Sequence, residues 1–405
     1  MLAAVFLLIA VRQVGGVTLR IWQVMLAGAL AVLLTGQIGP LDALRAINTD
    51  VIIFLFGMFV VGEAMVDSGY LAYTAKRLFS RAKNPDQLVL IILFSMGILS
   101  AILMNDTLAI IGTPLVLSLA TKWKISKKLL LLSLAIAITT GSVMSPIGNP
   151  QNLLVAVNAG MASPFLTFAV WLIVPTLVSL AAAFILLRLF YPGEFSARTA
   201  EPDTEVTCDR SLFFLTRCSL AIIFVLAAVK IVTSLTGTMI PLSLPLIAVC
   251  AAAPVLLFSQ RRFSILRAID WPTLVFFAAM FVLMESVWES GFILSFVDSS
   301  SISSIPVILG MSIIISQFIS NVPFVALFQP MIMQAGGTTA RLMALAAGST
   351  LAGNLTILGA ASNVIIIQNA EKSGETLTFF EFARVGVPLT IVQVGIFWVW
   401  LAVLG

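Results

Sequence analysis

The sequence GSVMSPIGNPQN, residues 141–152, interrupts an apolar segment that runs from residue 128 to residue 160. Its two prolines and two glycines oppose a continuous helix, because proline removes a backbone hydrogen bond and clashes with the preceding turn. At membrane depth the freed backbone groups need polar partners, which amide and hydroxyl side chains supply. The segment is therefore predicted to be a membrane helix with an unwound middle that can bind a polar solute or an ion.

The composition of the whole chain agrees with a membrane location. Of its 405 residues, 60% are hydrophobic and only 10% are charged, against about 25% charged in soluble domains. A single polar stretch, residues 191–210, exceeds about fifteen residues, so no sizeable soluble domain is expected. We predict an all-α polytopic membrane protein, retained in the cell (inner) membrane.

Side chains suited to enzyme chemistry are scarce. The chain has no His, and its three Cys, at positions 208, 218 and 250, stand in unrelated surroundings. Neither a disulfide framework nor a metal site is predicted, and no cofactor is implied. An intramembrane enzyme is the competing class, but no nucleophile and base pair is visible, so we expect a protein that is not an enzyme.

Apolar runs bounded by charges or by Gly and Pro predict about ten membrane spans. They lie near 2–15, 19–38, 50–70, 128–160, 164–191, 213–233, 240–259, 272–291, 340–370 and 379–404. Two further runs, 87–121 and 303–334, are too long for one span and too short for two, and each has a polar centre. These two runs are predicted to be re-entrant hairpins.

The positions of the Lys and Arg residues fix the orientation. Clusters of basic residues flank the first hairpin on both sides, and cytoplasmic loops carry such residues in excess. With these clusters inside, all 22 Lys and Arg lie inside except Arg45, Lys230 and Arg341. Both termini are then predicted outside, and the two hairpins enter from opposite faces.

The chain also contains an internal repeat. At an offset of 222 residues, Leu44-Arg45-Ala46-Ile47 matches Leu266-Arg267-Ala268-Ile269, and Glu63 matches Glu285. We expect a first repeat at 1–191, a cytoplasmic linker at 192–212 and a second repeat at 213–405, each repeat with five spans and one hairpin. Inverted repeats with broken helices are typical of secondary transporters.

Four polar interruptions are predicted to form one shared cavity: the two hairpin tips, residues 141–152, and the matching residues 353–363. Their carbonyls, amides and hydroxyls can replace water around a polar solute or small cation. The candidate binding residues are Asn105, Asp106, Thr107, Thr113, Ser142, Ser145, Asn149, Asn152, Ser320, Asn321, Asn354, Thr356, Ser362 and Asn363. The alternative for each residue is that it only satisfies the broken backbone.

Asp106 is the one acidic residue at either tip, since Val322 occupies the matching position. A carboxylate at membrane depth is costly, which indicates a proton carrier or a cation ligand. The alternative is a helix cap for the residues that follow, at Ala109-Ile110. Glu63 and Glu285 lie nearer helix ends, and we expect packing roles for them.

These motifs resemble the ion transporter superfamily, in particular the arsenite efflux permeases and related anion permeases. The resemblance rests on Asn105-Asp106-Thr107 with Thr113-Pro114, on residues 145–152, and on residues 316–323. It covers essentially the whole chain. Sodium-coupled dicarboxylate relatives carry Ser-Asn-Thr at both tips, whereas here the tips contain Asn-Asp-Thr and Ser-Asn-Val, which disfavours a dicarboxylate.

The resemblance implies an antiporter that exports arsenite or antimonite in exchange for protons, with arsenic resistance as the result. Arsenous acid is largely neutral near pH 7, and the four interruptions hold no Lys or Arg. The alternative is a sodium-coupled symporter of a small, dicarboxylate-like anion, or a Na+/H+ antiporter. The expected partners are this solute, H+ or Na+, and the lipid bilayer. An ATPase on loop 192–210 and a homodimer remain open, and no nucleic acid is expected.

Overall fold

The computed structural model describes residues 13–14, 17–18, 21–195, 209–236, 242–290 and 304–405, and these are predominantly helical. One strand pair, β1 (Gln13–Val14) with β2 (Val17–Thr18), precedes the helices. Of the expected span 2–15, only Gln13–Val14 belong to the described residues, and they form a strand where a helix was expected.

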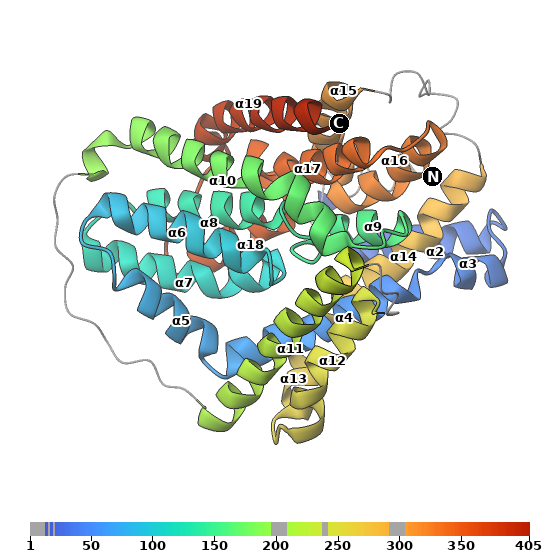
Figure 1. Ribbon diagram of the computed structural model, residues 1–405, viewed down its shortest axis with the longest axis horizontal. Helices are drawn as coiled ribbons and strands as arrows, with labels where there is room; N and C mark the ends of the chain where they lie inside the picture. Colours follow the sequence, from blue (N-terminus) through green and yellow to red (C-terminus); the bar gives the residue numbers. More distant parts are fainter. Residues whose placement is uncertain (1–12, 15–16, 19–20, 196–208, 237–241, 291–303) are drawn as a thin grey trace.

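Apart from α5 and α11, which have no counterpart among the described residues, the helices follow one another in a similar order in the two halves of the chain (Figure 1). The first half contains α2 (Ile21–Leu34), α3 (Pro40–Ala46), α4 (Thr49–Asp67), α5 (Tyr70–Phe79), α6 (Pro85–Ser100), α7 (Asn105–Trp123), α8 (Lys127–Ser142), α9 (Pro150–Asn158) and α10 (Pro164–Phe190). The second contains α11 (Arg210–Leu235), α12 (Leu244–Phe258), α13 (Arg262–Ala268), α14 (Trp271–Glu289), α15 (Ile305–Ile319), α16 (Asn321–Gln334), α17 (Thr339–Leu355), α18 (Ala361–Lys372) and α19 (Phe379–Leu404). Short 3-10 turns follow α10 at Pro192–Phe195 and α17 at Ile357–Gly359.

The sequence repeat has a counterpart in these helices. Helices α3 and α4 correspond residue for residue, at the offset of 222, to α13 and α14. Their packing is reciprocal, because α4 packs on α12 while α14 packs on α2. Helices α4 and α14 therefore make corresponding contacts in the two halves.

The helices are arranged in two lobes. In Figure 1 the helices α2–α4 and α11–α14 occupy the lower right, and α6–α10 with α15–α19 occupy the rest. Helix α5 joins the lobes, since it follows α4 and contacts α6 and α7. Its buried side chains Leu71, Ala75 and Phe79 recur every fourth residue, which leaves the opposite face polar and exposed.

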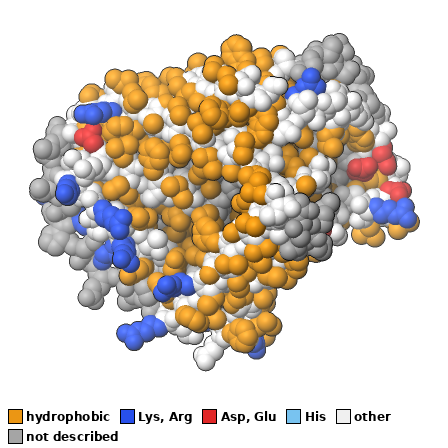
Figure 2. Space-filling model, in the orientation of Figure 1, with side chains coloured by type: hydrophobic (Ala, Val, Ile, Leu, Met, Phe, Trp, Pro, Cys, Tyr) orange, Lys and Arg blue, Asp and Glu red, His pale blue; other side chains and the backbone are white. Residues whose placement is uncertain are grey.

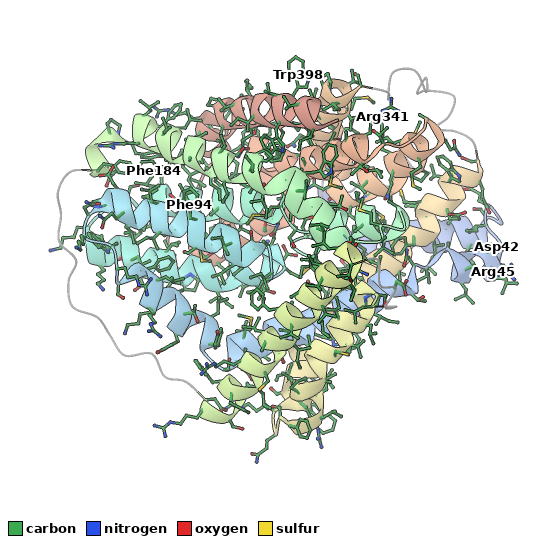
Figure 3. The ribbon with its side chains drawn as sticks, viewed as in Figure 1. Asp42, Arg45, Phe94, Phe184, Arg341 and Trp398 are labelled. Atoms are coloured by element: carbon green, nitrogen blue, oxygen red, sulfur yellow. The ribbon has the colours of Figure 1, made fainter. Side chains whose placement is uncertain are left out.

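Among the described residues, five helices are long and apolar enough to cross a membrane: α4, α10, α11, α14 and α19. Val170, Val174 and Val178 follow one exposed stripe of α10, as expected of a lipid-facing helix. Figure 2 shows apolar side chains over most of the visible face, with basic side chains gathered at its left and lower edges. Asp42 and Arg45 lie at the right-hand end of the molecule in Figure 3.

The two runs predicted as hairpins each fold into a pair of helices in contact. The residues 101–104 turn α6 back onto α7, so that the start of α6 and the end of α7 lie at the same end (Figure 1). Ser320 alone joins α15 to α16. Its φ of 71° is costly for a residue with a side chain, so the surrounding contacts must impose it.

Glycines set the contact between α6 and α8. A Cβ added at Gly141 would lie 2.2 Å from the carbonyl oxygen of Gly97, so neither helix could keep its place. We expect Gly141→Ala to destabilise the protein by about 3 kcal/mol, as overpacking does in dense cores. Gly310→Ala on α15, where nothing lies within 4 Å of the added Cβ, is the matched control. Equal apparent melting temperatures for the two purified variants would contradict this close contact.

Candidate functional site

The first interruption of a predicted span separates α8 from α9 and is held by one side chain. Asn152 is fully buried and its amide nitrogen donates to the carbonyl oxygens of Ser142, Val143 and Ser145 at 3.0–3.2 Å. These are backbone oxygens that lose their helical partners where α8 ends. Asn152 therefore forms hydrogen bonds to the interrupted backbone, which is the alternative role predicted for each candidate residue.

Asn149 and Ser142 connect this interruption to the tip of the first hairpin. Asn149 begins α9 as its N-cap, accepting a bond from the backbone of Asn152, and its amide nitrogen donates to Ser142 Oγ at 3.0 Å. Asn105 at the hairpin tip donates to the same hydroxyl at 3.2 Å. Ser142 thus joins the tip of the α6–α7 hairpin to the gap between α8 and α9.

The second interruption is built in a similar way. Asn363 donates to the carbonyl oxygen of Gly353 at 2.6 Å, and these two residues match Asn152 and Ser142 at an offset of 211. Asn321 at the second tip donates to the carbonyl oxygen of Gly359 at 3.0 Å. Each hairpin tip is therefore bound to the interruption in its own half of the chain.

Four asparagine side chains at the tips and interruptions donate hydrogen bonds through the amide nitrogen, while the amide oxygen accepts none from the described residues. The buried Oδ1 atoms of Asn105, Asn321, Asn354 and Asn363 have no hydrogen-bond partner among the described residues. The orientation is fixed for Asn321 and Asn363, because their partners are backbone carbonyls that can only accept. An unpaired buried acceptor costs about 1–3 kcal/mol, so these oxygens favour a ligand that brings donors or positive charge.

Polar residues that were not among the candidates predicted from the sequence connect the two halves of the chain. Thr350 on α17 donates to Asn152 Oδ1 at 3.1 Å and accepts from Asn149 at 3.2 Å. Thr140 on α8 accepts from Asn354 at 2.9 Å and from Gln393 at 3.0 Å. These contacts join residues that are 198 to 253 positions apart in the sequence, so only the tertiary packing of the helices reveals them.

The remaining candidates take several different places. Thr113 is buried and donates to the carbonyl oxygen of Ala109 in its own helix, while Ser145 Oγ accepts from the backbone of Ile147. Thr356 donates to Gln317 at 2.8 Å, a contact between the second interruption and α15. The other three candidates lie as follows: Ser320 is half-buried at the second tip, Ser362 is buried at the start of α18, and Thr107 is half-buried near Gly62 of α4.

Asp106 lies in the first turn of α7 and is half-buried. The capping alternative is wrong, because α7 begins at Asn105 with Met104 as its N-cap and has no side-chain cap. The carboxylate forms no hydrogen bond or ion pair with the described residues. A helix N-terminus favours negative charge, so the position suits an ionised carboxylate. The role of Asp106 in binding a proton or a cation stays a prediction.

The repeated glutamates lie at the seam between the lobes. Glu63 follows Gly62, where a Cβ would come within 3.1 Å of Thr107 Oγ1 on the first hairpin. Glu285 lines a crevice of about 300 Å³ together with Asn48, Asn158 and Trp288. These positions adjoin the hairpins without belonging to either amide cluster.

With this geometry in view, comparison with known proteins identifies the family. The model of the CitMHS family, described as a citrate transporter, matches residues 5–341. The chain belongs to the CitMHS family. CitMHS proteins fall within the ion transporter superfamily, so the resemblance seen in the sequence is confirmed at that level, while the match names citrate transporters and not arsenite permeases.

Relatives with this architecture are also transporters. An uncharacterized transporter of Mycobacterium bovis is 28% identical over 400 residues, covering 92% of this chain and 91% of the relative. The silicon efflux transporter LSI3 of Oryza sativa subsp. japonica is 24% identical over 440 residues, covering 92% and 90%. The YdaH transporter of Alcanivorax borkumensis has a similar fold, with a TM-score of 0.59, 16% identity and coverage of 92% and 88%. This CitMHS protein is a multi-pass secondary transporter.

Proposed function

We propose that this CitMHS protein exports a small neutral metalloid hydroxide, with arsenous acid (or antimonite) as the substrate, in exchange for protons. The observation that carries the proposal is the set of four buried amide oxygens without donors. A hydroxide with several O–H groups supplies these donors, whereas a free carboxylate supplies none.

The charge of the site supports the same substrate. The two hairpin tips and the two interruptions contain no Lys or Arg, so an anion would meet no cationic partner there. The rice relative is named a silicon efflux transporter. Silicon in neutral water is carried by silicic acid, which is also a small uncharged hydroxide.

Coupling is assigned to Asp106. Its carboxylate takes up a proton at one face and releases it at the other when the hairpin lobe moves against the lobe of α2–α4 and α11–α14. The two halves of the chain are proposed to be inverted repeats, each with a re-entrant hairpin, because alternating access commonly uses such pairs.

A transport assay tests this function directly. Inside-out vesicles that contain the protein and a pH-sensitive dye are supplied in parallel with arsenite, sodium and citrate. We expect arsenite uptake that dissipates an imposed proton gradient, and no such response in vesicles without the protein. Uptake of citrate or sodium without arsenite would refute metalloid export.

Cation-coupled carboxylate transport is the second candidate, since the family is described as a citrate transporter. The four amide oxygens are also suitable ligands for Na+, and a bound cation would offset the charge of the carboxylate. In the same assay this candidate predicts citrate uptake that requires sodium. Arsenite uptake without added sodium separates the two candidates.

The proposed topology makes a separate prediction. Lys83 precedes α6 and Lys124 follows α7, and both are exposed. If the first hairpin is re-entrant, Lys83→Cys and Lys124→Cys should both react with an impermeant thiol reagent from the cytoplasmic face only. Arg45→Cys, at the right-hand end of the molecule in Figure 3, should react only from outside. Labelling of Lys83→Cys and Lys124→Cys from different faces would show that this segment crosses.

A further inference from the structure

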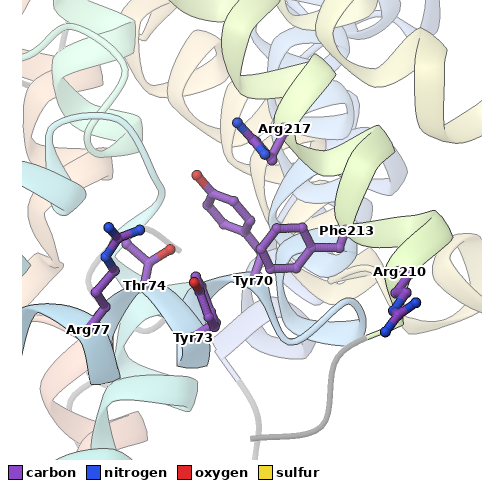
Figure 4. Close-up of a pocket in the computed structure, with 7 residues that line it drawn as sticks. All are labelled: Tyr70, Tyr73, Thr74, Arg77, Arg210, Phe213 and Arg217. Atoms are coloured by element: carbon purple, nitrogen blue, oxygen red, sulfur yellow. The ribbon is translucent and has the colours of Figure 1, made fainter.

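A second pocket lies far from the amide clusters, between α5 and the first turns of α11. Its volume is about 520 Å³, within the usual range for small-molecule sites. The pocket is lined by aromatic, hydroxyl and guanidinium side chains: Tyr70, Tyr73, Thr74, Arg77, Arg210, Phe213 and Arg217 (Figure 4). Three arginines around one pocket create a strongly positive potential, so the chemistry of the pocket suits an anion.

The three arginines have no counter-charge in the described part of the chain. None of them forms an ion pair with a described carboxylate, although two carboxylates lie near this region. Asp209 contacts Arg261 at 3.3 Å and Asp67 contacts the same guanidinium at 3.7 Å. Arg261 thus occupies both of these carboxylates, and no carboxylate of the described residues forms an ion pair with the arginines of the pocket.

Aromatic contacts make this a built pocket. The Phe213 ring packs 4.9 Å from that of Tyr70 and 5.6 Å from that of Tyr73, which docks α11 on α5. In Figure 4 the Tyr70 hydroxyl points into the space between Arg77 and Arg217, while Arg210 lies on the other side of Phe213. A ligand between Arg77 and Arg217 would therefore meet two guanidinium groups and a phenol donor beside an apolar wall.

We propose that this pocket binds a phosphate group, carried either by the headgroup of an anionic membrane lipid or by a free cytosolic phosphate. Guanidinium groups match the oxygens of phosphate with paired hydrogen bonds, and the phenol adds a further donor. The bound phosphate connects α5, which leads into the first hairpin, to α11, which packs on α12 and α4. It therefore links the two lobes at a point where they adjoin.

The test measures binding to the full-length protein, so its result is independent of the transported substrate. The probes are phosphatidic acid, phosphatidylcholine and inorganic phosphate, followed by native mass spectrometry for the lipids and by melting-temperature shifts for phosphate. We expect at least tenfold preference for phosphatidic acid over phosphatidylcholine. The combined variant Arg77→Gln, Arg210→Gln and Arg217→Gln should lose about tenfold in affinity.

The matched control removes three exposed basic charges elsewhere: Arg81→Gln, Lys83→Gln and Arg267→Gln. Arg77→Lys with Arg217→Lys keeps the charge, loses the paired geometry and should bind with intermediate affinity. Binding of phosphatidic acid alone identifies a lipid site, and binding of inorganic phosphate as well identifies a site for free phosphate. Equal losses in the pocket variant and the control, or no binding of either probe, would overturn the proposal.

Discussion

Replacing Asp106 with Asn should abolish proton-driven accumulation of substrate while leaving exchange of substrate down its own gradient. The amide keeps the size of the carboxylate but cannot titrate or carry its negative charge. The amide clusters at Asn321 and Asn363 remain intact, so binding and movement of the hairpins should continue. We expect accumulation in proteoliposomes with an imposed pH gradient to fall at least a hundredfold, with counterflow within a few fold of the unmodified protein.

Two further variants make this result specific. Asp106→Glu keeps a titratable group and should retain part of the accumulation. Asp86→Asn removes a carboxylate from the same hairpin at its other end, where Asp86 pairs with Arg188 at 3.1 Å, and should leave coupling unchanged. If Asp106→Asn still builds a gradient with normal pH dependence, Asp106 does not carry the proton, and Glu63, Glu285 or a sodium site must be tested.

The interrupted helices could be predicted from the sequence because their cause is local. Pro146, Pro150 and the neighbouring glycines oppose helix formation whatever the helix packs against. Accordingly, α8 ends at Ser142 and α9 begins at Pro150. The segment 340–370 likewise divides into α17 and α18 around the 3-10 turn at Ile357–Gly359. A polar residue, Ser320, also marks the turn between α15 and α16, whereas the turn between α6 and α7 is the apolar stretch 101–104 and the polar residues of that run begin α7.

Other features depend on tertiary packing and left no local signal. Thr350 lies in an apolar run and becomes a partner of Asn149 and Asn152 only because α17 packs against α9. The start of α7 at Asn105 was also not apparent, and it places Asp106 inside the first turn instead of at the cap. The amphipathic helix α5 was missed because the predicted span 50–70 ended where α5 begins.

The pattern of bonds also separates two residues that the sequence made equivalent. Asn152 and Asn363 match in the repeat, yet Asn152 satisfies three backbone carbonyls and Asn363 satisfies one. Asn152 Oδ1 accepts from Thr350, whereas Asn363 Oδ1 has no donor among the described residues. One residue thus bonds the backbone through its whole amide group, and the other keeps an amide oxygen without a donor among the described residues.

We therefore expect Asn152→Ala and Asn363→Ala to fail in different ways. Asn152→Ala removes the hydrogen bonds to three backbone carbonyls and the bond from Thr350, so the loss of stability should be about 3 kcal/mol. Asn363→Ala removes one such bond and should cost about 1 kcal/mol, but it deletes a free acceptor oxygen and should lower transport at least tenfold. Apparent melting temperatures and initial transport rates per folded molecule measure the two effects.

Asn363→Asp provides the matched test of the oxygen itself. It keeps an acceptor at the free position and replaces the donor to Gly353 by a second oxygen, so a cation would bind much more tightly, whereas a neutral hydroxide would gain only a stronger hydrogen bond. If Asn363→Ala lost mainly stability and Asn152→Ala mainly transport, the assignment of holding and binding roles would be reversed. If both variants lost stability but kept transport, the free amide oxygens would be unpaired acceptors without a ligand, and the ligand would have to bind elsewhere between the hairpins.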